Sequence, residues 1–229
     1  FVKSSAYRAG ESVWFARAFS VAREPVRAVL YAVALGCGDL YLDGEAVSDG
    51  YFDMPSYAFE KAVCYRAYDL TCLLQPGPHT LTCHVGDGAW ADYRRTRGTV
   101  YAERSAVKPL REPCFWAVLE MTDAAGKKTR VTTADGDWYC QAGPVLVNRL
   151  RGGEIYDARR EVTEFPTVDE IPEGWLPAVP DGTEKGPLRV SRTPPSRVQE
   201  ILPVARVECP SGSREDGLYL LDFGRMLTG

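Results

Sequence analysis

The hydrophobic residues of this chain fall in short runs, and glycine, proline and aspartate stand between the runs. The runs 13–21 (VWFARAFSV) and 26–35 (VRAVLYAVAL) are rich in residues that favour extended backbone. In 79–85 (HTLTCHV) polar and apolar residues alternate, as in a strand with one buried face. The same criteria predict strands at 40–42, 65–68, 116–122, 128–133, 201–209 and 218–223. Short strands without a long helix indicate an all-β sandwich.

Turn residues support this assignment. Asp43-Gly44 follows the strand at 40–42 and is typical of a type I′ hairpin turn, because both residues tolerate a positive φ. Ala124-Ala125-Gly126 predicts a second hairpin. Asp69 is expected to cap one helical turn over 70–74. Trp90 follows the turn sequence GDGA and is expected on a loop.

The composition changes after Phe165 and predicts three segments. Residues 1–165 form the predicted β-sandwich. Residues 166–198 are rich in proline and are expected to be an extended connector with little sheet pairing. Residues 199–229 hold two predicted strands, too few for a stable domain, and are expected to be the truncated start of a second β-domain.

Charge and cysteine content narrow the function. The net charge of −4 argues against a nucleic-acid partner, and the basic run Arg94, Arg95 and Arg97 is more typical of a solvated loop. No apolar stretch reaches the roughly 20 residues that span a bilayer, and the first residues lack the apolar segment of a signal peptide. Seven cysteines, an odd number without C-x-x-C spacing, favour a reducing compartment and predict a cytoplasmic protein.

The sequence offers no convincing metal site. His79 and His84 are five residues apart on one predicted strand and should point to opposite faces. The acidic turn Asp135-Gly136-Asp137 lacks the bidentate glutamate of an EF-hand loop and is expected to be a plain turn. No metal ligands are assigned and no cofactor is predicted.

Six ordered motifs carry a family resemblance. LYLDG resembles a strand ending in Asn-Gly, with Asp43 in place of asparagine, and DMPSY resembles a Leu-x-Pro-Gly-Trp loop that here lacks the Gly and Trp. YRAYDLTCLLQPG is a close match, and GDGAW and DFGRMLTG are further partial matches. GPVLVNRLRGGEIYDARRE is the most specific one. Together these stretches resemble the N-terminal region of bacterial α-L-rhamnosidases.

The resemblance implies a jelly-roll β-sandwich related to a rhamnose-binding module, the start of a second β-domain, and a downstream catalytic (α/α)₆ barrel. Glycoside hydrolysis uses two carboxyl groups that flank the scissile bond. In the family this pair lies on the barrel. The chain is therefore expected to be a non-catalytic accessory region that binds carbohydrate, including L-rhamnose-containing glycans, or positions the barrel. The family's module can bind sugar through calcium, to which Asp87 or Asp92 could contribute, so calcium is left open.

Sugar binding requires an aromatic ring for the CH face and polar groups for the hydroxyls. Two predicted loops offer both, and their residues are Asp53, Tyr57 and Glu60 in one loop and Trp90, Asp92 and Tyr93 in the other. The alternative is that Trp90 and Tyr57 only cover the edge of the core.

The cluster Glu154, Tyr156, Asp157 and Arg159 is interpreted mainly as a structural network in which Arg159 bridges carboxylates, and a sugar site is the alternative. At the level of the whole chain, two other hypotheses stay open. One is a purely structural scaffold. The other is an interaction module that associates through an exposed strand at 218–223.

Overall fold

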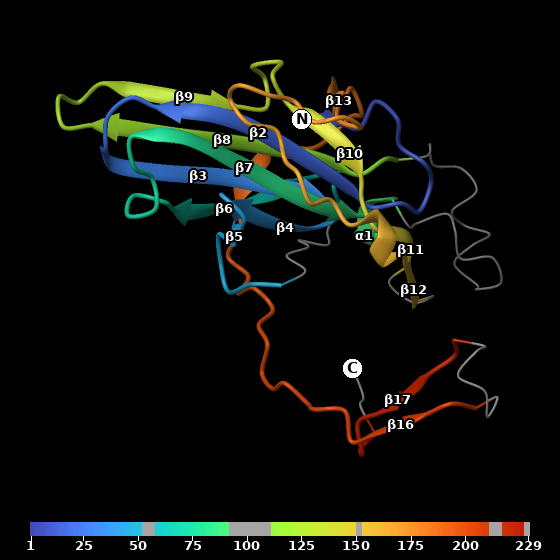
Figure 1. The fold of residues 1–229 in the computed structure, drawn as a ribbon. Helices are drawn as coiled ribbons and strands as arrows, with labels where there is room; N and C mark the ends of the chain where they lie inside the picture. Colours follow the sequence, from blue (N-terminus) through green and yellow to red (C-terminus); the bar gives the residue numbers. More distant parts are fainter. Residues whose placement is uncertain (52–57, 92–110, 150–152, 211–216, 227–229) are drawn as a thin grey trace. The chain divides into compact units, whose positions relative to one another are not determined.

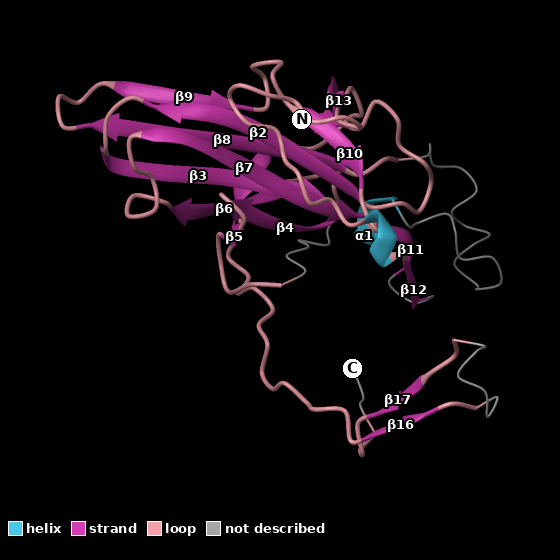
Figure 2. Cartoon of the chain, viewed as in Figure 1, coloured by secondary structure: helices cyan, strands magenta, loops and turns pink. Residues whose placement is uncertain are grey.

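The computed structural model describes residues 1–51, 58–91, 111–149, 153–210 and 217–226. The chain divides into two compact units, Phe1–Ser196 and Arg197–Gly229. This division is close to the predicted change at residue 198, while the predicted boundary at 165 falls inside the first unit. Figure 2 shows that strands dominate the described residues, where helix is limited to α1 (Gly88–Ala91) and the 3-10 turn Ala158–Arg160.

The first unit is a β-sandwich of two mainly antiparallel sheets (Figure 1). The seven-stranded sheet has the order β14 (Val179–Pro180), β1 (Val2–Lys3), β8 (Cys114–Asp123), β3 (Pro25–Leu35), β6 (Val63–Asp69) and β15 (Leu188–Val190), and β9 (Lys128–Thr132) pairs with β8. The six-stranded sheet has the order β13 (Leu176–Pro177), β10 (Tyr139–Ala142), β2 (Val13–Val21), β7 (Gly77–Gly86), β4 (Cys37–Leu42) and β5 (Glu45–Ala46). β11 (Val145–Arg149) and β12 (Gly153–Tyr156) form a separate hairpin. The predicted all-β sandwich is confirmed.

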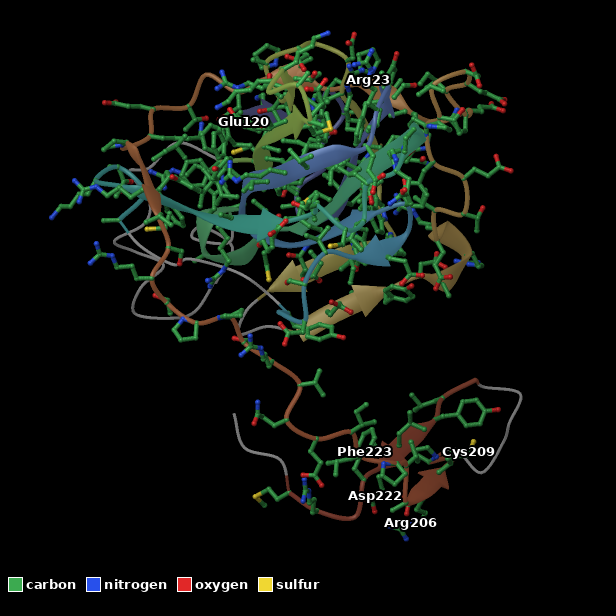
Figure 3. The ribbon with its side chains drawn as sticks, turned by 90° about the vertical axis from the view of Figure 1, so that its left-hand side faces the viewer. Arg23, Glu120, Arg206, Cys209, Asp222 and Phe223 are labelled. Carbon is green, nitrogen blue, oxygen red and sulfur yellow. The ribbon has the colours of Figure 1, made fainter. Side chains whose placement is uncertain are left out.

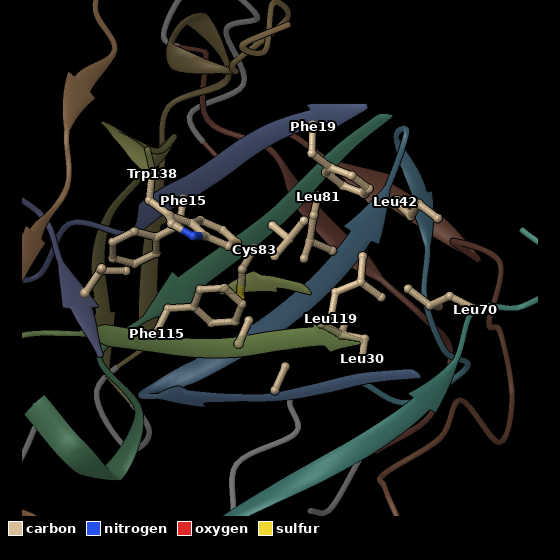
Figure 4. Close-up of a cluster of buried hydrophobic side chains, with 14 of the residues drawn as sticks. Phe15, Phe19, Leu30, Leu42, Leu70, Leu81, Cys83, Phe115, Leu119 and Trp138 are labelled. Carbon is tan, nitrogen blue, oxygen red and sulfur yellow. The ribbon is translucent and has the colours of Figure 1, made fainter. Parts of the chain in front are cut away.

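The main core lies between the two sheets. Phe15 of β2 stacks on Phe115 of β8, with ring centroids 6.1 Å apart, and Trp138 meets Phe115 edge-on at 5.3 Å (Figure 4). Alternate residues of β3 leave this core for a second one: Leu30 lies between the sheets, whereas Leu35 faces the opposite side. β3 is therefore buried on both faces, and this explains its nearly continuous apolar sequence.

The local turn predictions agree with the structure. Asp43 and Gly44 have φ values of 52° and 85° and join β4 to β5, as a type I′ turn requires. The Asp69 side chain accepts a hydrogen bond from the Thr71 backbone N–H at 3.0 Å and caps a single turn that ends at the buried Leu74. Hydrogen bonds from Thr71 also lower the pKa of Asp69.

The proline-rich segment is more closely joined to the sandwich than the sequence predicts. β13 and β14 pair with β10 and β1, and β15 adds a parallel strand beside β6. The prolines do not prevent this because each of these pairings is only two or three residues long. The sequence predicts an extended connector with little sheet pairing, and these three short pairings attach it to both sheets of the sandwich.

Gly186 fixes how closely this segment approaches the sandwich. Its N–H donates to the Phe59 carbonyl at 2.7 Å, and a Cβ placed on it would lie 2.4 Å from the Lys61 carbonyl carbon. We expect Gly186→Ala to lower the free energy of unfolding by about 1–3 kcal/mol, because the backbone has to shift. Gly182→Ala is the matched control, since its Cβ would meet no atom within 4 Å. Equal midpoints for the two variants in urea unfolding would contradict this close contact.

The second unit contains one described hairpin, β16 (Arg206–Glu208) paired with β17 (Leu220–Asp222). Arg206 lies 3.3 Å from the Asp222 carboxylate, and Figure 3 shows both side chains on this hairpin beside Phe223. Leu220 and Leu221 are about half exposed. The predicted strand at 218–223 is thus present but shorter, and its central residues are paired rather than free.

Candidate functional site

The described part of the chain contains two of the six predicted sugar-contacting residues, Glu60 and Trp90. The other four, Asp53, Tyr57, Asp92 and Tyr93, lie outside the described residues, so the complete constellation stays a prediction.

Trp90 lies in the short helix α1 (Gly88–Ala91) rather than on the expected loop. Its side chain is 1% exposed and joins the second hydrophobic cluster, where Phe59 meets the indole edge-on at 5.0 Å. The indole N–H donates to the Glu112 carbonyl at 2.7 Å. The Arg111 guanidinium carbon lies 4.3 Å from the centroid of the ring. Trp90 is therefore a core residue in this structure, as the alternative interpretation expected.

Arg111 links the two described candidates. Its guanidinium lies over Trp90 and also forms an ion pair with the Glu60 carboxylate. The Glu60 side chain is 46% exposed, whereas Arg111 is 14% exposed. Glu60 can therefore offer a carboxylate oxygen to a ligand at the surface while Arg111 holds its position. No sequence pattern indicated this link, because Arg111 lies in an irregular polar stretch far along the chain from both partners.

The GDGAW motif also supplies a buried structural network. Asp87 is fully buried and accepts a hydrogen bond from the Tyr7 hydroxyl at 2.6 Å. The Asn148 side chain accepts from the Asp87 N–H at 2.5 Å and donates to the Gly10 carbonyl at 2.8 Å. These contacts connect α1, β11 and the loop before β2. They favour a structural role for Asp87, and no group of three potential metal-ligating side chains occurs among the described residues.

The GEIYDARRE motif forms a tight turn after β12. Asp157 caps the 3-10 helix Ala158–Arg160 and receives two hydrogen bonds from the Arg159 guanidinium, at 2.8 and 2.7 Å. These bonds lower the pKa of Asp157 to about 2. Arg159 is 89% exposed and, among the described residues, pairs with this carboxylate alone, whereas Arg160 reaches Glu11 at 3.0 Å. The bridge between segments is therefore made by Arg160 and not by Arg159, because the turn directs only Arg160 back to the sandwich.

The two histidines occupy different faces of β7, as the sequence predicts. His79 lies 2.6 Å from the Asp43 carboxylate. His84 stacks on Trp14 with ring centroids 4.4 Å apart and lies 2.8 Å from the Ser12 hydroxyl. Neither arrangement brings the two imidazoles to a shared metal position.

Burial lowers the pKa of His84 from 6.5 to about 4, so the folded chain holds this imidazole neutral. The unfolded chain binds a proton below about pH 6.5, and stability should therefore fall as the pH decreases from 6.5 toward 4. We expect a loss of roughly 1.4 kcal/mol per pH unit from this group. Urea unfolding across this range measures the slope. A His84→Gln variant that retains the wild-type slope would contradict the assignment.

Comparison with known proteins identifies the family. The sequence profile of the α-L-rhamnosidase N-terminal domain matches residues 23–200. An α-L-rhamnosidase of Streptomyces avermitilis is 31% identical over 206 residues, which cover 89% of this chain and 19% of that protein. The chain spans about a fifth of the length of the curated relatives it matches.

Solved structures agree with the sequence match. The native α-L-rhamnosidase of Aspergillus terreus superposes with a TM-score of 0.78 and 25% identity, over 97% of this chain and 25% of the other. The S. avermitilis α-L-rhamnosidase complexed with L-rhamnose has a TM-score of 0.75 and 27% identity, over 94% of this chain and 20% of the other. The resemblance inferred from the motifs is confirmed: this chain belongs to the α-L-rhamnosidase N-terminal domain family.

Proposed function

We propose that this chain is the accessory N-terminal region of a glycoside hydrolase that acts on rhamnose-containing glycans, and that it contributes a carbohydrate-contacting surface beside a separate catalytic region. The observation that carries the proposal is the family match over residues 23–200, together with the small share of the relatives that the chain covers. One of these related structures was solved with L-rhamnose. The catalytic carboxylates are assigned to the part of the relatives that this chain does not match.

The proposed contact surface centres on Glu60 and on the segments that the sequence predicts as loops, with Asp53, Tyr57, Asp92 and Tyr93. Glu60 supports it as an exposed carboxylate held by Arg111. Trp90 acts in this proposal as a buried support for the loop ends and not as the stacking platform. All seven cysteines are free thiols, and this favours a reducing, cytoplasmic location. Among the described helices, none has the length and apolar character needed to cross a bilayer.

Titration of the purified chain with L-rhamnose, with and without calcium, tests the proposal. Two-dimensional NMR of backbone amides is a suitable readout, because it does not depend on the buried tryptophans. We expect saturable shifts that Asp92→Ala and Tyr93→Ala weaken by about tenfold. Lys127→Ala, a substitution on the exposed turn between β8 and β9, should leave them unchanged.

The purely structural scaffold is the second candidate function, and the burial of Trp90 favours it. A scaffold predicts no amide shifts at tens of millimolar L-rhamnose, with or without calcium. It also predicts an unchanged thermal midpoint in the presence of sugar. That result would overturn carbohydrate binding and leave the accessory assignment in place.

A further inference from the structure

A polar hollow of about 490 Å³ opens on the sandwich, and neither of the two described sugar-contacting candidates, Glu60 and Trp90, lines it. Its volume lies within the range of small-molecule sites. The loop before β2, the strand β10 and the GEIYDARRE turn form its walls. The polar side chains that define it are Arg8, Glu11, Gln141, Arg159, Arg160 and Glu161.

Two of the three arginines that line this hollow are each paired with a carboxylate. Arg160 pairs with Glu11 at 3.0 Å, and Arg159 pairs with Asp157. The Tyr156 hydroxyl donates to Glu161 at 2.5 Å. The Arg8 guanidinium, by contrast, has no hydrogen-bond or ion-pair partner among the described residues, and it is exposed. Arg8 is therefore the one cation of this lining without a carboxylate partner among the described residues, while the Glu161 carboxylate is held by a neutral hydroxyl.

The backbone that carries Arg8 is held in place. The Tyr7 hydroxyl accepts a hydrogen bond from the Gly10 N–H at 3.1 Å and donates to the buried Asp87. The Arg8 carbonyl accepts from the Glu11 N–H at 3.0 Å, and Asn148 holds the Gly10 carbonyl. A fixed loop reduces the conformational entropy that a ligand must overcome on binding. The contacts of Tyr7 and Asn148 thus hold the loop that positions Arg8 at the hollow.

We propose that this hollow binds a carboxylate-bearing saccharide, with the carboxylate on the Arg8 guanidinium. The planar guanidinium can donate two parallel hydrogen bonds to a carboxylate. The Gln141 amide and the paired charges of Arg160 and Glu11 supply donors and acceptors for hydroxyl groups. Leu176, 46% exposed, offers an apolar contact for the ring CH groups. The saccharide part of this assignment rests on the proposed carbohydrate function, whereas the anionic part rests on Arg8.

The test compares matched sugars on the intact chain. D-glucuronate and D-glucose differ in the carboxylate, and isothermal calorimetry at low salt measures both. We expect D-glucuronate to bind about tenfold more tightly than D-glucose, and Arg8→Ala to abolish the difference. Arg8→Lys should retain part of it, because the charge remains but the two-bond geometry is lost. Arg27→Ala, on an exposed position of β3, is the control and should behave as wild type.

The other outcomes are equally informative. If acetate competes as well as D-glucuronate, the hollow is a simple anion site and the saccharide assignment is wrong. If L-rhamnose binds but D-glucuronate shows no preference and Arg8→Ala changes nothing, this inference fails while the proposed function stands. If L-rhamnose does not bind but D-glucuronate binds through Arg8, the proposed contact surface around Glu60 is wrong and the proposed site in the hollow is supported. If no sugar binds, both proposals fail.

Discussion

Replacement of Trp90 by alanine should lower the free energy of unfolding by about 3–5 kcal/mol. The side chain is 1% exposed, contacts Phe59 edge-on, and donates its indole N–H to the Glu112 carbonyl at 2.7 Å. Truncation removes the buried ring, leaves a cavity, and deprives the Glu112 carbonyl of its donor. Urea unfolding followed by far-UV circular dichroism measures the loss without relying on tryptophan fluorescence.

Trp116→Ala is the appropriate comparison. Trp116 belongs to the edge of the same cluster, where its ring lies 5.6 Å from that of Tyr65, but it is only partly buried. Trp116→Ala should lower the free energy of unfolding less than Trp90→Ala does, because less apolar area is lost from the interior. If Trp90→Ala costs less than about 1 kcal/mol and abolishes L-rhamnose binding, Trp90 is an exposed sugar platform and its assignment to the core is wrong.

Lys185→Met should also lower the free energy of unfolding by about 3–5 kcal/mol. Lys185 and Asp181 form an ion pair whose side chains are 7% and 4% exposed. The lysine ammonium also lies 4.6 Å from the centroid of the Phe1 ring and donates to the Thr183 carbonyl at 2.8 Å. Methionine retains much of the aliphatic length but leaves the Asp181 carboxylate buried without its cation, which is the costly part of the change.

The double variant Lys185→Met/Asp181→Leu separates two effects: the loss of the ion pair and the cost of a buried carboxylate without its cation. Replacing both charges removes the isolated carboxylate, so the double variant should be more stable than Lys185→Met alone. A double variant that is less stable than the single one would show that the pair itself, and not the stranded charge, dominates the loss.

The pH dependence provides a second check on this pair. Burial acts to raise the pKa of Asp181, but hydrogen bonds from Lys185 and Thr183 outweigh it and hold the pKa below 3.8. A lowered carboxyl pKa contributes stability that is present above pH 3.8 and is lost as the pH falls through the folded value. The difference in the free energy of unfolding between wild type and Lys185→Met should therefore be constant near neutral pH. It should shrink in acid, because the unpaired Asp181 carboxylate of the variant takes up a proton. A gap that widens in acid would contradict this interpretation.

Several elements were accessible from local sequence alone. The strand predicted at 13–21 coincides with β2, and the Asp43-Gly44 turn has the two positive φ values its residues favour. Both depend on neighbouring residues, because side-chain alternation and backbone φ preferences act over a few positions. The family could also be inferred from the sequence, since its motifs keep their order along the chain.

The environment of the candidate site could not be inferred in this way. GDGAW marks the end of β7, but the structure forms the short helix α1 there, and whether Trp90 faces water depends on Phe59 and Arg111, which come from distant segments. The same applies to Asp181 and Lys185, which in sequence resemble an ordinary charged loop. The sequence around Arg8 shows no motif, because the hollow that Arg8 lines is formed by segments far apart in the chain.

The sequence by itself determined the strand-forming segments, the tight turns, the all-β class and the family. Only the tertiary structure decided which strands pair, that the proline-rich segment adds to both sheets, that Trp90 is buried, and that Arg8 lines a polar hollow. The physical reason is the range of the interactions. Backbone preferences are set by adjacent residues, whereas burial and charge compensation depend on contacts between residues that only the folded chain brings together.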